Sequence, residues 1–275
     1  MPHPSGPLRY GAASDRREAV LRRVLSDGYA SLSALAAELD VSERTVRRDL
    51  VDLGTAGAVA LVPGGATAPP GTVARAPFAA RAVTEAAAKR AIARLARTLV
   101  SPGDSVALDA GSTISFLAAE LLPLSPLTVI TSSLEVIGRF SSDAHASLIG
   151  VGGQFDPDRR AFVGPVTRAT LEDMRATTAF VACSGVHATG IACDSQADAE
   201  VKRALLGMAG RRVLVATSSV FRRVAPVRMA EFTGIDTLVT DDGLDPEPRD
   251  RLADAGVQVL LAPLGVAPSR GGPGD

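Results

Sequence analysis

The first fifth of the chain carries three stripes of apolar residues at helical spacing, each bounded by polar start and stop signals. Apolar side chains recur three and four positions apart over 15–26, and an Asp-Gly pair ends that pattern. Ser31 precedes a second stripe, and Ser42 precedes a third that Gly54 or Gly57 closes. The pattern therefore predicts three short helices, with a tight turn between the second and the third.

A β-prone run and a proline-rich stretch follow. The run Ala58–Val62 stops at Pro-Gly-Gly, which predicts one arm of a small β-wing. Four prolines fall between positions 63 and 77, a density typical of a linker. We therefore place a first domain at 14–68, a linker at 69–83 and a second domain at 84–262.

Seven short, continuous apolar runs alternate with helical patterns after Thr84. Such runs are typical of strands that helices cover on both faces, and the alternation indicates a parallel sheet built from βαβ units. The predicted fold class is α/β, with a winged helical domain before a mainly parallel sheet domain. The predicted strands are 105–108, 127–131, 146–150, 178–183, 212–216, 237–239 and 258–261. The predicted helices between and after them are 112–122, 134–140, 166–175, 197–209 and 246–255.

Composition places the chain among folded proteins of an aqueous compartment. Hydrophobic residues make up 46% and charged residues 21%, so a large core can form and disorder is excluded for most of the chain. No apolar run reaches the length of a membrane span, and the first residues lack the apolar core of a signal peptide. Cys183 and Cys193 are too few for a disulfide framework, so we expect two inert thiols in a reducing cytoplasm. The balance of 29 basic against 30 acidic residues gives no bulk support for nucleic-acid binding.

The third helical stripe gathers Arg44, Arg47 and Arg48 directly after its capping serine. At about 100° per residue these three share one helix face with Val51, while apolar residues lie opposite. Guanidinium groups pair with guanine or phosphate, and hydroxyl groups at a helix N-terminus can bond a phosphate oxygen. A solvated helix face is the alternative interpretation, because residues 9–67 hold eight arginines and eight acids.

The order of elements decides between these two interpretations. A helix, a tight turn, a second helix and a β-wing are typical of a helix-turn-helix whose last helix enters the major groove of DNA. The candidate DNA-contacting residues are Ser42, Glu43, Arg44, Thr45, Arg47 and Arg48.

The segment 41–50, V-S-E-R-T-V-R-R-D-L, followed by G-G-A at 64–66, resembles the winged helix-turn-helix of the DeoR family of bacterial transcriptional regulators. That family's pattern includes V-S-x-x-T-[IV]-R-R-D-L and a G-G-A after the wing. The resemblance implies double-stranded operator DNA as the partner. It also implies that the hydroxyl and arginine residues of the segment face the DNA, with Arg44 as a source of operator preference.

Glycine and hydroxyl residues follow several predicted strands of the second domain. The run Asp109 to Thr113, D-A-G-S-T, stands between a strand and a helix, at the edge where open parallel sheets bind ligands. A tight turn with an ordinary hydroxyl cap is the alternative. Similar loops follow later strands and would converge at one rim, and Lys202 on a later helix is either a counter-charge or a surface charge. The candidate ligand-binding residues are Asp109, Gly111, Ser112, Thr113, Thr131, Ser132, Gly152, Gly153, Gly185 and Lys202.

The order L-D-A-G-S-T, V-I-T-x-S, G-G, F-V-G-P and A-F, within 87 to about 261, resembles the sensor domain of the DeoR family. The resemblance implies a fold similar to sugar isomerases and coenzyme A transferases, and a phosphorylated sugar or related metabolite as effector. Thr177 stands where members commonly have Asp, and Thr217 and Val220 stand where D-x-S-K-F has Asp and Lys. A lysine is a natural phosphate partner, so its absence leaves the effector open, with Lys202 as a candidate replacement.

Two function classes follow from these residues. The first is a DNA-binding transcriptional regulator, and the resemblance favours a repressor of a carbohydrate-metabolism operon that an effector relieves, acting as a homodimer or homotetramer on a palindromic operator. The second is a sugar-phosphate isomerase, for which Asp109 and Glu200 are available carboxylates. The Asp and Lys of the family pattern, which could transfer protons, are missing. We interpret the chain as a regulator and not an enzyme. No metal or cofactor is expected, because His187 and the two cysteines show no CxxC or HxxxH spacing.

Overall fold

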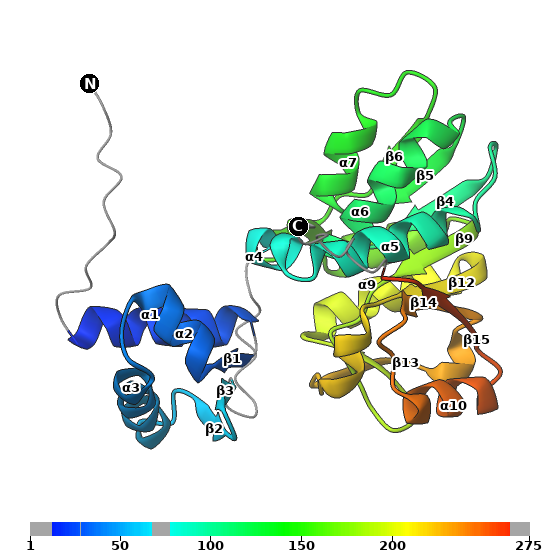
Figure 1. The fold of residues 1–275 in the computed structure, drawn as a ribbon. Helices are drawn as coiled ribbons and strands as arrows, with labels where there is room; N and C mark the ends of the chain where they lie inside the picture. The colour runs from blue at the N-terminus through cyan, green and yellow to red at the C-terminus, as the bar shows by residue number, and fades with distance from the viewer. Residues whose placement is uncertain (1–12, 28, 68–77, 265–275) are drawn as a thin grey trace, which may run out of the picture. The chain divides into compact units, whose positions relative to one another are not determined.

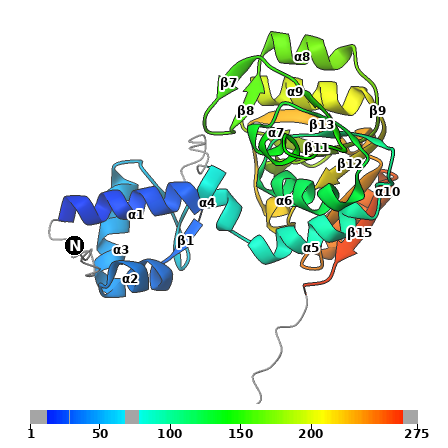
Figure 2. The same ribbon diagram turned by 90° about the horizontal axis from the view of Figure 1, so that it is seen from above.

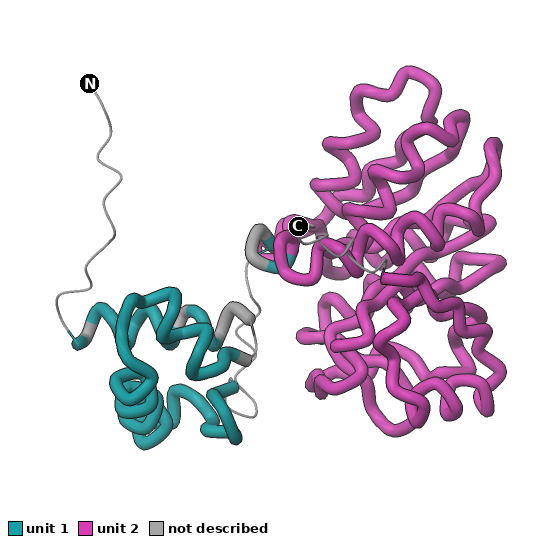
Figure 3. The backbone as a smooth tube through the Cα atoms, in the orientation of Figure 1, with its two compact units in different colours: residues 1–81 teal, residues 82–275 magenta. Residues whose placement is uncertain are grey.

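The computed structural model describes residues 13–27, 29–67 and 78–264 (Figure 1). The chain divides into two compact units, residues 1–81 and residues 82–275 (Figure 3). Up to position 77, the linker predicted at 69–83 lies outside the described residues. The rest of it, from Phe78 to Val83, forms helix α4. Each unit has its own hydrophobic core and is described by itself.

Unit 1 packs three helices against a small antiparallel sheet. Its helices are α1 (Ala13–Asp27), α2 (Leu32–Leu39) and α3 (Glu43–Thr55), and its strands are β1 (Tyr29–Ser31), β2 (Ala60–Val62) and β3 (Gly65–Thr67), in the order β1-β3-β2. The fully buried apolar side chains at its centre include Val20, Val24, Leu35, Val46, Leu50 and Ala66. The three predicted helices and the predicted wing arm are confirmed.

Strand β1 was not predicted, because three residues are too few to show a strand period. It forms by pairing with β3, in a register that sets Ala30 opposite Ala66. Gly65 permits this pairing, since a Cβ at that position would lie 2.1 Å from the Ala30 carbonyl oxygen. Within the Gly-Gly-Ala stretch, Gly65 therefore allows the two strands to approach closely, and Gly64, with a φ of 81°, forms the turn.

Unit 2 is built on a seven-stranded sheet in the order β15-β14-β12-β9-β4-β5-β6, in which every neighbouring pair is parallel. These strands are β4 (Ser105–Leu108), β5 (Thr128–Thr131), β6 (Ser147–Gly150), β9 (Ala176–Val181), β12 (Ala209–Val215), β14 (Thr237–Asp241) and β15 (Gln258–Ala262). The helices around them are α5 (Ala86–Arg97), α6 (Ser112–Leu121), α7 (Leu134–Phe140), α8 (Pro165–Glu172), α9 (Gln196–Gly207) and α10 (Pro246–Asp254). All seven predicted strands occur, with ends that differ by up to three residues.

Helices cover both faces of this sheet, with α5 and α6 on one side and α8 and α9 on the other (Figure 2). Successive side chains of a strand point to opposite faces, so each strand contributes to both layers. In β4, Val106 and Leu108 pack with α5, α6 and α7, whereas Ala107 packs with the layer that contains α9. This double coverage explains why the strands read as continuous apolar runs.

The chain reverses its direction of travel across the sheet between β4 and β9. From β4 it proceeds to β5 and β6 on one side, and from β9 to β12, β14 and β15 on the other. In open α/β sheets, ligands bind outside the carboxyl ends of the strands at such a reversal. In this sheet that place is the carboxyl ends of β4 and β9.

Short antiparallel pieces complete unit 2, and none of them was predicted. Strands β7 (Gln154–Asp156) and β8 (Ala161–Val163) form a hairpin, and β10 (Gly185–Val186), β11 (Gly190–Cys193) and β13 (Val227–Glu231) form a three-stranded sheet. Two predictions were wrong as a result. Cys193, which is outside every predicted strand, lies in β11, and Cys183, the last residue of the predicted strand 178–183, follows the end of β9. Both errors arise because pairing with distant segments sets the limits of these strands.

Candidate DNA-binding face and effector site

Helix α3 begins with a hydroxyl cap. The Oγ of Ser42 accepts the backbone N–H of Thr45 at 3.2 Å and lies 2.8 Å from the Thr45 hydroxyl oxygen. Glu43 follows in the first turn, where a negative charge is favourable. The cap fixes the start of the helix and leaves both Ser42 and Glu43 exposed.

The arginines of α1 and α3 whose side chains the structure describes fall into two groups. Arg16, Arg17 and Arg23 of α1 each form an ion pair with an acid of α2 or α3. The three arginines of α3 are exposed, share the predicted face, and make no hydrogen bond or ion pair with any residue that the structure describes. Acids of α2 and α3 are paired with arginines of α1. The equal numbers of arginines and acids in the sequence therefore do not reveal the positive face of α3.

Asp49 is a functional residue that sequence reasoning left without a role. It lies on the buried side of α3, 4% exposed, and its two carboxylate oxygens accept the Nε and Nη2 groups of Arg16 at 2.6 and 3.1 Å. This two-pronged pair holds α3 against α1 and so sets the direction of the arginine face. A signal was present, because helical spacing puts Asp49 beside the buried Leu50, where an acid needs a partner.

Asp109 directly follows β4, at the carboxyl edge of the sheet, and is 2% exposed. Its backbone N–H donates to the Phe180 carbonyl at 3.0 Å, and its Oδ2 accepts the Ala182 N–H at 2.9 Å. The same oxygen accepts a hydrogen bond from the Lys202 ammonium of α9. Burial alone would lower the pKa of Lys202, but the Asp109 and Asp198 carboxylates outweigh it and hold that pKa above its usual value. The interpretation of Lys202 as a surface charge is therefore wrong.

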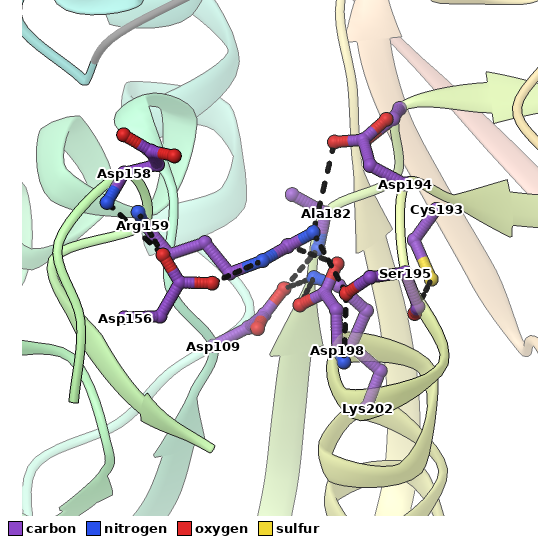
Figure 4. A network of polar contacts seen from close by, with 11 residues as sticks. Asp109, Asp156, Asp158, Arg159, Ala182, Cys193, Asp194, Ser195, Asp198 and Lys202 are labelled. Carbon is purple, nitrogen blue, oxygen red and sulfur yellow. Dashed lines mark hydrogen bonds and ion pairs between the residues drawn. The ribbon is translucent and has the colours of Figure 1, made fainter. Parts of the chain in front are cut away.

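Arg159 extends this charged network from the β7–β8 hairpin. It lies between β7 and β8, its side chain is 5% exposed, and its guanidinium pairs with Asp198, which is 3.7 Å from Lys202. The guanidinium also reaches the Ser195 hydroxyl at 3.3 Å and Asp194 at 3.8 Å. Figure 4 shows the Arg159 side chain spanning from the hairpin to the start of α9. No sequence pattern marked Arg159, because its loop, D-P-D-R-R, is typical of a solvated turn.

The N-terminus of α6 offers donors that the fold does not use. Its cap is Gly111, which has a φ of 148° and no side-chain cap. Ser112 and Thr113 follow in the first turn, 6% and 7% exposed, and their hydroxyls make no hydrogen bond with any described residue. The alternative of an ordinary hydroxyl cap is therefore wrong here. These hydroxyls and the free N–H groups of the first turn can bind an anion together.

Other predicted site residues serve the fold at the same edge. The Thr131 hydroxyl donates to a β4 carbonyl at 2.7 Å, and the Ser132 carbonyl accepts an N–H of β8 at 2.9 Å. A Cβ on Gly153 would lie 2.0 Å from the Thr167 hydroxyl oxygen, and a Cβ on Gly185 would lie 2.7 Å from the Ala225 backbone nitrogen. The Gly152 carbonyl accepts a hydrogen bond from the same Thr167 hydroxyl at 2.9 Å. Thr131, Ser132, Gly152 and Gly153 thus shape the loops after β5 and β6, beside the loop that carries Asp109.

The two cysteines lie in or against the core of unit 2. Burial raises the pKa of Cys183 to about 12, and burial raises the pKa of Cys193 to about 12. Among the described residues, no cluster of His, Cys, Asp and Glu has the geometry of a metal site, and no helix has the length and apolar content to cross a membrane.

Comparison with known proteins matches both units. Residues 16–71 match the DeoR-like helix-turn-helix domain, and residues 84–242 match the DeoR C terminal sensor domain. The chain belongs to the DeoR family. It is therefore a DNA-binding transcriptional regulator, with the helix-turn-helix in unit 1 and the sensor domain in unit 2.

Relatives of this DeoR-family regulator span nearly its whole length. The HTH-type transcriptional regulator YgbI of Escherichia coli is 32% identical over 90% of this chain and 97% of its own. The L-fucose operon activator of Haemophilus influenzae is 31% identical, covering 83% and 92%, and the transcriptional repressor AccR of Agrobacterium fabrum is 28% identical, covering 85% and 92%. Among solved structures, ribose 5-phosphate isomerase A of Methanocaldococcus jannaschii superposes on 48% of this chain and 53% of its own, at 18% identity and a TM-score of 0.35.

The positions at which this DeoR-family chain departs from the family pattern lie at opposite edges of the sheet. Thr177 is at the amino end of β9, where its backbone N–H donates to the Ser105 hydroxyl at 2.9 Å. Its side chain is therefore remote from the carboxyl ends of β4 and β9. Thr217 and Val220 are at the carboxyl edge, in or before the short helix η2 (Ser218–Arg222). The Thr217 hydroxyl donates to Glu85 at 3.2 Å, and Val220 packs against the core. Only the second departure changes the rim of the effector site.

Proposed function

We infer that the exposed face of α3 docks in the major groove of operator DNA. The observation that carries this inference is a contrast between two helices: described arginines of α1 are paired with acids, whereas Arg44, Arg47 and Arg48 have no partner among the described residues. Guanidinium groups without a protein partner are available for guanine edges and phosphates. Ser42, Glu43 and Thr45, at the start of the same helix, would lie against the DNA backbone, to which Ser42 and Thr45 offer hydroxyls.

The effector site that the geometry supports best lies at the carboxyl edge between β4 and β9. The start of α6, with Gly111, Ser112 and Thr113, would bind an anionic group such as a phosphate. Asp109 and Lys202 lie directly beyond the end of β4, where they would meet the hydroxyl groups of a sugar. The network around Arg159 already holds four acids against two bases, Asp109, Asp156, Asp194 and Asp198 against Arg159 and Lys202. A phosphate is therefore better placed at α6 than among these carboxylates.

The target that follows is a carbohydrate-metabolism operon. Relatives named for sugar operons, including the L-fucose operon activator and a putative aga operon transcriptional repressor of Escherichia coli, support it. We favour repression in the absence of effector and release on its binding. The regulator would act in the cytoplasm as a homodimer or homotetramer, because one winged helix reads only half of a palindromic operator.

The isomerase alternative is not favoured by the state of Asp109, one of its two candidate carboxylates, and of Lys202, which pairs with it. The Asp109 carboxylate is held by the Ala182 N–H and Lys202, and the raised pKa of Lys202 keeps it an ammonium. Neither group is free to remove a proton from a carbon acid. We infer that the chain does not turn over pentose or hexose phosphates.

The deciding experiment is a fluorescence-anisotropy titration of the full chain against DNA from upstream of its own and neighbouring genes. The titration is run at two salt concentrations, with and without a panel of sugars in phosphorylated and unphosphorylated forms. We expect selective binding to one duplex and its release by one phosphorylated sugar. Release by an unphosphorylated sugar alone would contradict the anion site at α6, and turnover of any sugar phosphate would reinstate the isomerase.

A further inference from the structure

Val51 is an exposed apolar residue at the centre of the arginine face of α3. Its exposed fraction is 46%, and among the described residues of unit 1 only Val51 and Leu61 are large apolar side chains with such exposure. At about 100° per residue, Val51 points between the directions of Arg44 and Arg47, one turn beyond Arg47 and Arg48. Val51 therefore faces the same binding partner as the three arginines.

The fold does not account for Val51. The core contacts of α3 are made from its other side, by Val46 and Leu50. Leu61 has a packing role, since its Cγ lies 3.1 Å from a Cβ built on Gly54, so it covers the end of α3 from the wing. A β-branched residue is also a poorer helix former than Ala, Lys or Glu at an exposed position. Neither packing nor helix propensity favours valine at this position.

The major groove offers one apolar group to such a side chain. Beside their polar atoms, guanine, cytosine and adenine present only ring C–H groups there, whereas thymine presents a 5-methyl group. We propose that Val51 reads a thymine methyl in each operator half-site, next to the bases or phosphates that Arg47 and Arg48 bind. Valine adds specificity in this way without adding charge. The proposal rests on the docking of the α3 face described above.

The test uses duplexes that the full chain selects from a random DNA library. Each thymine of a selected half-site is replaced in turn by uracil, which removes only the methyl group, and the dissociation constant is measured by anisotropy. We expect one thymine per half-site at which uracil weakens binding about fourfold, the value of one buried methyl group. Val51→Ala should bind the thymine and uracil duplexes equally at that position and with unchanged ratios elsewhere. Val51→Thr, which replaces one methyl with a hydroxyl and keeps the other, should retain part of the preference.

Two controls separate the possible failures. Leu61→Ala should keep the thymine preference, because Leu61 faces Gly54. Arg48→Ala should weaken binding to both duplexes by the same factor; if neither Arg48→Ala nor Arg47→Ala weakens binding, the docking face itself is wrong. A wild-type chain indifferent to every uracil, or a Val51→Ala chain that keeps the preference, overturns the thymine contact alone. A changed oligomeric state of Val51→Ala with the preference intact would assign Val51 to a contact between copies and also overturn it.

Discussion

Asp49 of α3 and Arg16 of α1 form a two-pronged ion pair in which the carboxylate is almost fully buried. The pair joins the helix that carries the arginine face to the first helix of the unit. We therefore expect Asp49 to affect DNA binding without touching the DNA.

Asp49→Ala should destabilise unit 1 by about 2–3 kcal/mol, because it leaves Arg16 without its partner in a partly buried place. Asp52→Ala is the matched control: Asp52 pairs with Arg17 from the same helix, but its side chain is 48% exposed, so its loss should change stability by less than about 0.5 kcal/mol. Hydrogen exchange of the α1 and α3 amides in the full chain measures both changes in stability. Equal protection in the two variants would show that the Arg16 pair contributes no more than a surface pair.

Arg47→Ala and Arg48→Ala should each weaken operator binding by about 1–3 kcal/mol if the arginine contacts a guanine, and should lower the salt dependence if it contacts phosphate. Arg168→Ala in α8 is the control, because Arg168 is an exposed arginine of the sensor domain that pairs with Glu172. Anisotropy at several salt concentrations separates base contacts from phosphate contacts. Wild-type affinity in both α3 variants would remove α3 as the recognition helix.

Lys202→Met should destabilise unit 2 by about 3–5 kcal/mol, since Asp109 is left buried beside Asp198 without a cation. Asp109→Asn should cost less, and the double variant should recover part of the loss, because the pair is coupled. Urea unfolding of the full chain, with hydrogen exchange to assign each transition, gives the coupling. Additive effects would indicate that the two side chains act independently.

Two glycine-to-alanine changes should have opposite signs. Gly65→Ala forces a Cβ against the Ala30 carbonyl and should cost about 1–3 kcal/mol and weaken DNA binding through the wing. Gly138→Ala in α7 meets nothing within 4 Å and should stabilise unit 2 by about 0.5–1 kcal/mol. Thermal unfolding of the full chain compares them. A neutral Gly65→Ala would mean that β1 and β3 can separate without loss.

Cys183 and Cys193 should resist alkylation in the folded chain. With a pKa of about 12 for each thiol, only about one molecule in ten thousand carries the thiolate at pH 8, and labelling should rise as pH increases toward 12. Iodoacetamide labelling followed by mass spectrometry tests this, with chain unfolded in guanidinium as the reactive control. Rapid labelling of either cysteine at pH 8 in the native state would show that its surroundings open.

The sequence predicted the strands of the seven-stranded sheet and the helices between them. They could be located because a strand buried on both faces must be apolar throughout. The pieces that were missed, β1, β7, β8, β10, β11 and β13, have two to five residues and gain their order by pairing with one another or with β3. The local sequence of each piece does not indicate which segment it pairs with.

By itself, the sequence determined the α/β class, the order of the elements, the arginine face of α3 and the glycine-hydroxyl loop after β4, since each depends on residues close together in the chain. Only the tertiary structure decided the pairing of charges. It paired Asp49, Asp52 and Glu38 with arginines of α1, so that the three arginines of α3 make no ion pair with any described residue. It also brought Asp109, Lys202 and Arg159 into one buried network from three separate segments. The physical reason is that a charge is neutralised by the group nearest in space, and folding sets that distance.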